Sequence, residues 1–214
     1  MNISLTEDDD NKNEEIKAVS LLELKPFAEQ PFKVLIDEDM NELVESIQQS
    51  GVLSPIIARP HKDGGYEILS GHRRVKACEL AGIKEVPVII KNIDDDTATI
   101  LLVDSNLQRE NILPSEKAYA YQMKLAAMKR KAGRPTKENH VQIGHNLTEK
   151  TSREEFSKEI GESPTQVQRY IRLTNLIDPI LDMVDNKQIA MNAAVEISYL
   201  GSKEQFDVLK TIES

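Results

Sequence analysis

Residues 66–81 read YEILSGHRRVKACELA, and this segment sets the architecture of the first half of the chain. Its first four residues alternate as in a strand, and its last seven have the apolar spacing of a helix. Gly71 therefore lies where a strand turns into a helix. The first N–H groups of a helix lack partners and carry the positive end of its dipole, so they favour an anion. Arg73 and Arg74 add forked donors for phosphate oxygens. The turn predicts a phosphate site, with a solvated helix start as the alternative.

The sequence around this turn alternates strands with helices. Apolar runs predict strands at 19–24 and 86–90, and a hairpin of 54–59 with 66–69 across Asp63-Gly64-Gly65. Helical spacing predicts helices at 39–49 and 73–80, the second closed by Gly82 at the C′ position. This order predicts a small α/β domain over residues 19–112, within an overall α+β fold.

Composition narrows the class of protein. The chain has 214 residues, 39% apolar residues, no Trp and one Cys, so we expect aliphatic cores and no internal disulfide or cysteine metal cluster. Residues 1–18 form an acidic segment that we expect to be disordered. No apolar stretch approaches the ~20 residues of a membrane span. We expect a cytoplasmic protein without a membrane partner.

Charge is distributed unevenly along the sequence. The net charge is −9, but residues 1–50 hold 13 Asp and Glu against 4 Lys and Arg, whereas the rest is balanced. Residues 109–172 hold 13 basic and 8 acidic side chains. A basic middle region is an electrostatic footprint for nucleic acid.

A second polar segment, Asp104-Ser105-Asn106-Leu107-Gln108-Arg109-Glu110, closes a helix predicted at 97–107. Amide, guanidinium and carboxylate groups beside apolar residues predict that this end of the helix has one polar face, which points at a ligand. The acids at 94–96 are interpreted as a helix start rather than a metal site, because negative charge favours helix N-termini.

From Pro114 onward the pattern is entirely helical, which predicts an all-α domain over 113–200. A long helix is expected at 115–130 and a flexible basic insert at 132–150. Thr151 to Glu154 has the pattern of a capping box, with Thr151 as N-cap. Ser163 and Pro164 start a second helix, and residues 201–214 begin a further, truncated helix.

These two starts have the spacing of a helix-turn-helix. Counting Arg153 as the first position puts Gly161 ninth, at the turn, and Val167 fifteenth, where the second helix packs on the first. An ordinary helical hairpin is the alternative. The residues expected to contact DNA are Thr165, Gln166, Gln168, Arg169 and Arg172, with Arg134 of a Gly-Arg-Pro segment as a minor-groove candidate.

The order of strand, Gly-x-Arg-Arg turn, Asn-Leu-Gln-Arg-Glu segment, Leu113-Pro114-Ser115-Glu116-Lys117-Ala118 and helix-turn-helix resembles the ParB/Spo0J partition proteins. The resemblance runs from about Ser20 to Leu200. It implies a ParB/sulfiredoxin-like N-terminal domain that binds CTP and Mg²⁺, and a helix-turn-helix domain that binds a centromere-like site in double-stranded DNA. It also implies a nucleotide-gated homodimeric clamp, a ParA-like Walker ATPase partner and association with the bacterial nucleoid, in segregation of a plasmid, mobile element or chromosome.

Matching positions carry the implied site residues. The resemblance assigns nucleotide contacts to the turn and its neighbours and a metal contact to Asn106. The implied nucleotide-binding residues are Gly51, Ser70, Gly71, His72, Arg73, Arg74, Asn106 and Arg109. The chain departs from the family at His72 and Ser105, where the family usually has Glu. Loss of these acids predicts at most weak CTP hydrolysis, with Asp104 as a possible catalytic substitute.

Other functions stay open. His72 and Arg73 also match the ATP-contacting turn of sulfiredoxins, but Gly71 stands where their nucleophilic Cys would be, which leaves ATP as an alternative ligand. A transcriptional regulator or nucleoid-occlusion protein on the same scaffold is a second hypothesis. A ParB-like nuclease or nucleotide-dependent kinase is a third, and it would need a carboxylate such as Asp104 near the turn.

Overall fold

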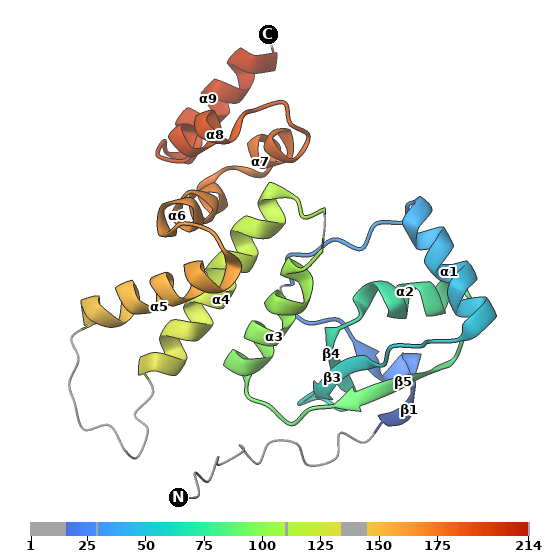
Figure 1. Cartoon of the computed structure of the whole chain (residues 1–214). Coiled ribbons are helices and arrows are strands. Elements are labelled where there is room, and N and C mark those ends of the chain that lie inside the picture. The colour runs from blue at the N-terminus through green and yellow to red at the C-terminus, as the bar shows by residue number, and fades with distance from the viewer. Residues whose placement is uncertain (1–15, 29, 110, 134–144, 214) are drawn as a thin grey trace, which may run out of the picture. The chain divides into compact units, whose positions relative to one another are not determined.

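The computed structural model describes residues 16–28, 30–109, 111–133 and 145–213 (Figure 1). The chain divides into two compact units. The first is formed by residues up to Ala28 together with Val34–Ile93, and the second by Glu29–Lys33 and residues from Asp94 onward. Residues 95–107, which the sequence groups with the first domain, belong to the second unit.

In its described residues, the first unit is a mixed five-stranded sheet with two α-helices. Its strand order is β1-β5-β3-β4-β2. The strands β3 and β4 form the expected antiparallel hairpin, whereas β5 runs parallel to β3 and β2 runs parallel to β4. The elements are β1 (Ile16–Ser20), β2 (Leu24–Lys25), α1 (Glu38–Ser50), β3 (Ile56–Pro60), β4 (Tyr66–Ser70), α2 (His72–Leu80) and β5 (Glu85–Ile90).

The first predicted strand is wrong in its bounds. The strand begins at Ile16 rather than Val19, and a 3-10 turn at Leu21–Glu23 separates it from β2. The Ser20 hydroxyl accepts a hydrogen bond from the Leu22 N–H at 3.3 Å, and the Leu22 side chain is 95% exposed. A serine that bonds the backbone two residues on offers the chain an alternative to the sheet. An apolar run therefore became a turn.

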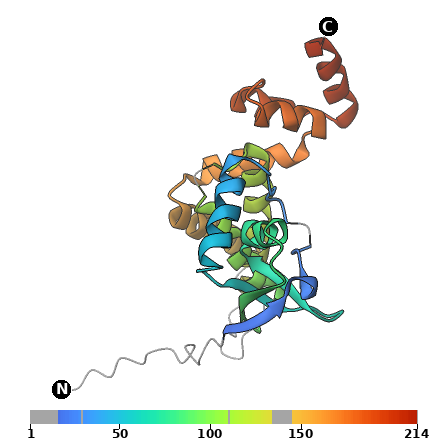
Figure 2. The same ribbon diagram turned by 90° about the vertical axis from the view of Figure 1, so that its right-hand side faces the viewer.

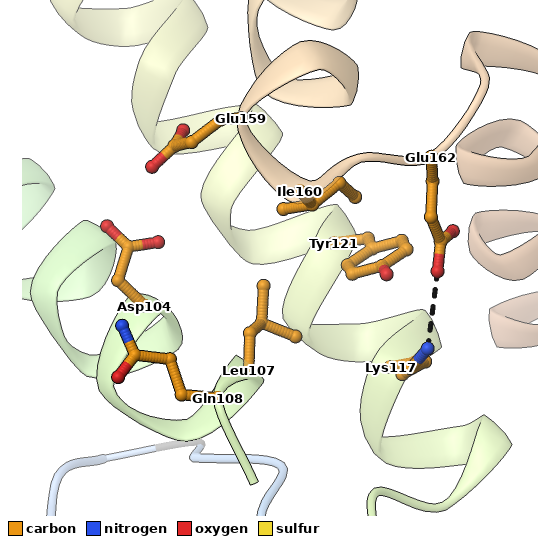
Figure 3. A pocket seen from close by; sticks show the side chains of 8 residues that line it. All are labelled: Asp104, Leu107, Gln108, Lys117, Tyr121, Glu159, Ile160 and Glu162. Carbon is orange, nitrogen blue, oxygen red and sulfur yellow. Dashed lines mark hydrogen bonds and ion pairs between the residues drawn. The ribbon is translucent and has the colours of Figure 1, made fainter. Parts of the chain in front are cut away.

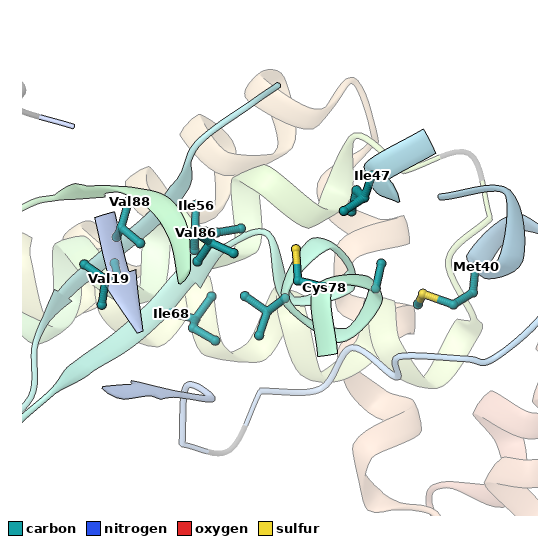
Figure 4. Packing of buried hydrophobic residues seen from close by; sticks show 11 residues of the cluster. Val19, Met40, Ile47, Ile56, Ile68, Cys78, Val86 and Val88 are labelled. Carbon is teal, nitrogen blue, oxygen red and sulfur yellow. The ribbon is translucent and has the colours of Figure 1, made fainter. Parts of the chain in front are cut away.

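The core of the first unit lies between the sheet and the two helices (Figure 4). Met40 and Ile47, seven residues apart, lie on the buried face of α1, as helical periodicity requires. Figures 1 and 2 show α1 beside α2, whose Cys78 is fully buried. This packing fixes the start of α2 at the C-terminal end of β4. This core is aliphatic, as composition predicted, whereas a buried cluster in the second unit contains Tyr121 and Phe156.

The second unit is helical throughout its described residues. Its elements are α3 (Asp95–Leu107), α4 (Pro114–Gly133), α5 (His145–Ile160), α6 (Pro164–Arg172), the 3-10 turn η2 (Leu173–Asn175), α7 (Asp178–Asp185), α8 (Met191–Ile197) and α9 (Ser202–Glu213). The Asp94 side chain accepts from the Thr97 N–H at 2.8 Å, which confirms that residues 94–96 start a helix.

The predicted capping box at Thr151 is wrong, because α5 begins at His145 and Thr151 lies inside it. The residues before Thr151 include good helix formers and no Gly or Pro, so nothing stops the helix from starting earlier. Both ends of the insert predicted at 132–150 are helical, since α4 reaches Gly133. Residues 134–144 and 1–15 lie outside the described residues, and residues 16–18, which we expected to be disordered, are part of β1.

Within the described parts of the chain, no helix combines the length and hydrophobicity that crossing a membrane requires.

Candidate functional site

The strand-to-helix turn in the first unit places a left-handed glycine before an uncapped helix start. Gly71 has φ +104°, and a Cβ placed on it would lie 2.7 Å from Ile56 Cδ1 and 3.0 Å from Arg74 Nη2. Only glycine fits such a position without strain. No side chain caps the N-terminus of α2, and its first turn contains no acid. The first N–H groups of α2 are therefore left without a side-chain acceptor.

The two arginines of the turn have different roles. Arg74 donates from Nη1 to the Pro55 carbonyl oxygen at 2.7 Å and also to the Ser54 carbonyl, so it holds the segment before β3. Arg73 lies 3.6 Å from the Asp37 carboxylate, which also caps α1 by accepting from the Met40 N–H at 2.9 Å. A guanidinium at 3.6 Å from one exposed acid is weakly held. Arg73 is therefore the more available phosphate ligand.

His72 lies at the first position of α2 and is partly buried. Burial lowers the pKa of its imidazole to about 4, although the negative charge of Glu67 opposes that shift. Its Nε2 atom is buried and has no hydrogen-bond partner within the described residues. At neutral pH this ring is uncharged, so it can offer a phosphate a hydrogen bond but not a charge.

The second predicted segment belongs to the other unit, at the end of α3. The Asn106 amide nitrogen donates to the Leu102 carbonyl at 2.8 Å, and the Ser105 hydroxyl donates to the same oxygen at 2.9 Å. Asn106 keeps its amide oxygen as an acceptor, and Arg109 follows the end of the helix. Gly51, with φ +70°, ends α1 in the first unit. Among the described residues, no group of three His, Cys, Asp or Glu is arranged to hold a metal ion.

Asp104 is held by a cation that the sequence did not indicate. Its carboxylate pairs with Lys124 of α4, whose side chain is only 1% exposed and also lies 2.7 Å from Glu159 of α5. The Asp104 carboxylate is therefore already engaged by a buried lysine. This pairing argues against the catalytic role suggested for Asp104.

A cavity of about 370 Å³ opens beside this cluster, between α3, α4 and α5 (Figure 3). Lys117 donates to Glu162 at 3.2 Å at one end of it. Burial and the nearby Glu162 raise the pKa of the Tyr121 hydroxyl. Apart from Lys117, the lining side chains from α4 and α5 belong to none of the motifs quoted above, and their meeting depends on packing. The lining residues are Asp104, Leu107, Gln108, Lys117, Tyr121, Glu159, Ile160 and Glu162.

The second unit contains the predicted helix-turn-helix in α5 and α6. Gly161 turns the chain with φ +70°, and the Ser163 hydroxyl caps α6 by accepting from the Gln166 N–H at 3.1 Å. Val167 is fully buried with Tyr121 and Phe156, whose rings meet edge to face with centroids 5.1 Å apart. The turn, the cap and the packing position are confirmed.

The residues expected to contact DNA are placed along α6. Thr165 is exposed, and Gln166 and Gln168 are partly exposed. Arg169 donates to the side chain of Asn192 in α8, and Arg172 donates to the Ser198 carbonyl at 2.6 Å. Arg134 lies outside the described residues. The outward face of α6 is polar and basic, as a recognition helix requires.

Comparison with known proteins agrees with this arrangement. The family model of the ParB N-terminal domain matches residues 5–107, and that of the ParB HTH domain matches residues 143–214. The "Probable chromosome-partitioning protein ParB" of Vibrio cholerae is 32% identical over 198 residues, which cover 92% of this chain and 60% of that protein. The "Nucleoid occlusion protein" of Bacillus mycoides is 33% identical over 201 residues, covering 93% of this chain and 62% of that protein.

A solved structure shares the fold. The C-terminally truncated chromosome-partitioning protein ParB from Caulobacter crescentus, complexed to the centromeric parS site, matches with a TM-score of 0.52 and 24% identity. The match covers 92% of this chain and 91% of that one. The chain spans about three fifths of the length of the Vibrio cholerae relative. With both family domains in this order, the chain belongs to the ParB family of partition proteins.

Proposed function

We propose that this chain is a site-specific DNA-binding partition protein that reads a centromere-like duplex through α6. The observation that carries the proposal is the mounting of α6. Its Val167 face is buried against Tyr121 and Phe156, while Thr165 is exposed at its N-terminal end. Helix-turn-helix proteins present this end of the second helix to base edges in the major groove.

The first unit is proposed to bind CTP, with ATP as the less favoured nucleotide. The turn suits a phosphate, because the start of α2 has neither a side-chain cap nor an acid, and the buried Nε2 of His72 has no partner among the described residues. The proposed ligands in the first unit are Gly51, Ser70, Gly71, His72, Arg73 and Arg74. The resemblance also implies contacts by Asn106 and Arg109, which belong to the second unit. Asn106 is the proposed Mg²⁺ contact. The bound nucleotide would supply the triphosphate whose binding and loss switch the protein between states.

Hydrolysis is expected to be slow. His72 and Ser105 replace two acids by neutral groups, which should favour a triphosphate and disfavour metal-assisted attack by water. Phosphate release from CTP, measured with and without cognate DNA, should stay near background. Clear DNA-stimulated release that is lost in Arg73→Ala would contradict this expectation.

The remaining partners are proposed on the basis of the family. They are a second copy of the chain, a ParA-like Walker ATPase, and the nucleoid in the bacterial cytoplasm. The chain spans about three fifths of the length of the Vibrio cholerae relative, so the activity of a full-length partition protein is proposed for this chain.

The central experiment is selection of duplexes from a random DNA pool by the purified chain, followed by calorimetry with CTP, ATP and GTP. A single enriched sequence, lost in Gln168→Ala but retained in the exposed control Lys203→Gln, would support site-specific reading. Enrichment of no sequence would contradict it. Binding of CTP in preference to ATP and GTP would support the nucleotide assignment.

A nucleoid-occlusion role is the second candidate, supported by the Bacillus mycoides relative with 33% identity. Both roles need the same DNA reading, so genome context separates them. A neighbouring gene for a Walker ATPase would favour partition. A division defect on deletion, with normal segregation, would favour occlusion.

A further inference from the structure

The last residue of α6 is bound to the end of α8. Arg172 donates from Nη2 to the Ser198 carbonyl oxygen at 2.6 Å and from Nε to the Ser198 hydroxyl at 3.3 Å. Its guanidinium carbon lies 3.9 Å from the centroid of the Tyr199 ring. A planar guanidinium that stacks on a ring and bonds a carbonyl is held in one orientation.

The acceptor side of this contact is itself fixed. Ser198 is 3% exposed, and its hydroxyl donates to the Val195 carbonyl at 2.6 Å. Ser198 directly follows α8, where a cation is favoured by the negative end of the helix dipole. At the other end of α8, Asn192 accepts from Arg169. Through Arg169 and Arg172, α6 thus contacts both ends of α8.

We propose that Arg172, Ser198 and Tyr199 form a brace that holds α6 in its DNA-reading orientation, and that Arg172 is a positioning residue and makes no phosphate or base contact. This inference rests on the proposed DNA-binding function. With nine residues, α6 is too short to be stable alone, so its orientation depends on what it packs against.

The position of Arg172 also fits a brace better than a reading role. Recognition helices contact base edges with their N-terminal residues, and Arg172 is the C-terminal residue of α6. Thr165, Gln166 and Gln168 lie nearer the start of the helix. We therefore expect these three residues to read the DNA sequence and Arg172 to hold their helix in position.

The test measures affinity for the selected duplex as a function of salt. The variants are Arg172→Gln, Arg172→Lys, Tyr199→Leu and the double variant Arg172→Gln with Tyr199→Leu. The exposed Lys203→Gln is the control for loss of one positive charge. We expect each single variant at the brace to weaken binding by roughly threefold to tenfold, from the strength of a partly buried cation–π contact. The double variant should bind the duplex no more weakly than whichever single variant has the lower affinity.

Two readouts separate a brace from a phosphate contact. The salt slope of Arg172→Gln should match that of Lys203→Gln, because no phosphate contact is lost. Arg172→Lys should fail to restore binding, because lysine keeps the charge but loses the fork and the stacking. A slope lowered by about 0.9 relative to the control, with Tyr199→Leu unchanged and Arg172→Lys active, would overturn the brace.

Absence of DNA binding by the unmodified chain would contradict the proposed function itself. Thermal unfolding of the same variants then still tests the contact. Equal, non-additive losses in Tm for Arg172→Gln and Tyr199→Leu would support a brace that serves another ligand of α6. Independent, additive losses would overturn it.

Discussion

Gly71 is the residue at which backbone geometry and the proposed ligand meet. Gly71→Ala should lower the free energy of unfolding by roughly 1–3 kcal/mol, because the new methyl would meet Ile56 at 2.7 Å in a left-handed conformation. Gly64→Ala is the matched control, since its φ is also positive at +80° but a Cβ there would meet no atom within 4 Å. Urea denaturation measures both variants. Equal losses would mean that the close approach to Ile56 adds nothing to the change in the free energy of unfolding.

His72 predicts a pH dependence of stability in the same turn. Its pKa is about 4 in the folded protein against the ordinary value of 6.5, so the unfolded chain binds more protons between these pH values. Its contribution is present above pH 6.5 and is lost as the pH falls toward 4, by up to about 3 kcal/mol. Denaturant midpoints between pH 7 and 4 measure this loss.

His72→Asn is the control for that measurement. It keeps a polar group at the start of α2 and removes the titration. The variant should lose the steep part of the stability profile between pH 6.5 and 4. An unchanged profile would assign the pH dependence to other groups in the protein.

At the scale of elements, α4 joins α3 and α5 through the buried Lys124. Lys124→Met should change the free energy of unfolding by less than about 1 kcal/mol, because its partners Asp104 and Glu159 are 36% and 52% exposed and can be solvated. Phe156→Ala, in the same interface and fully buried, should cost about 3–5 kcal/mol. Calorimetry on both variants checks this order. A loss above about 2 kcal/mol for Lys124→Met would show that the ion pairs contribute net stability.

Elements with a local stop or start signal were predictable from sequence. The cap at Ser163, the acids before α3 and the glycines beside α2 act within a few residues, so the pattern contains the whole cause. The start of α5 and the break after Ser20 were mispredicted. After Ser20, a serine that bonds the backbone competed with continuation of the strand, and before Thr151 no Gly or Pro stopped the helix from starting earlier.

At the scale of the whole molecule, the sequence predicted the order of an α+β part and a helical part. It also predicted the polar face of α6. It could not predict that Lys124 would meet Asp104 and Glu159, or that Arg172 would stack on Tyr199. These pairs are separated by 20 or more residues along the chain, and no periodicity encodes a contact between helices. Sequence motifs thus identified candidate binding residues, and the fold showed which of them already contact other parts of the protein.

The two units predict a reciprocal linkage between nucleotide and DNA. If CTP in the first unit changes the affinity of the second for its duplex by a given factor, DNA must change the affinity for CTP by the same factor. Arg73→Ala should abolish the CTP effect and leave the CTP-free affinity for DNA within about twofold, because Arg73 and α6 belong to different units. Gln168→Ala should weaken DNA binding and leave CTP affinity in the absence of DNA unchanged. Calorimetry of each ligand with and without the other measures both factors. Unequal factors would show that a further equilibrium, such as association of two copies, is coupled to binding.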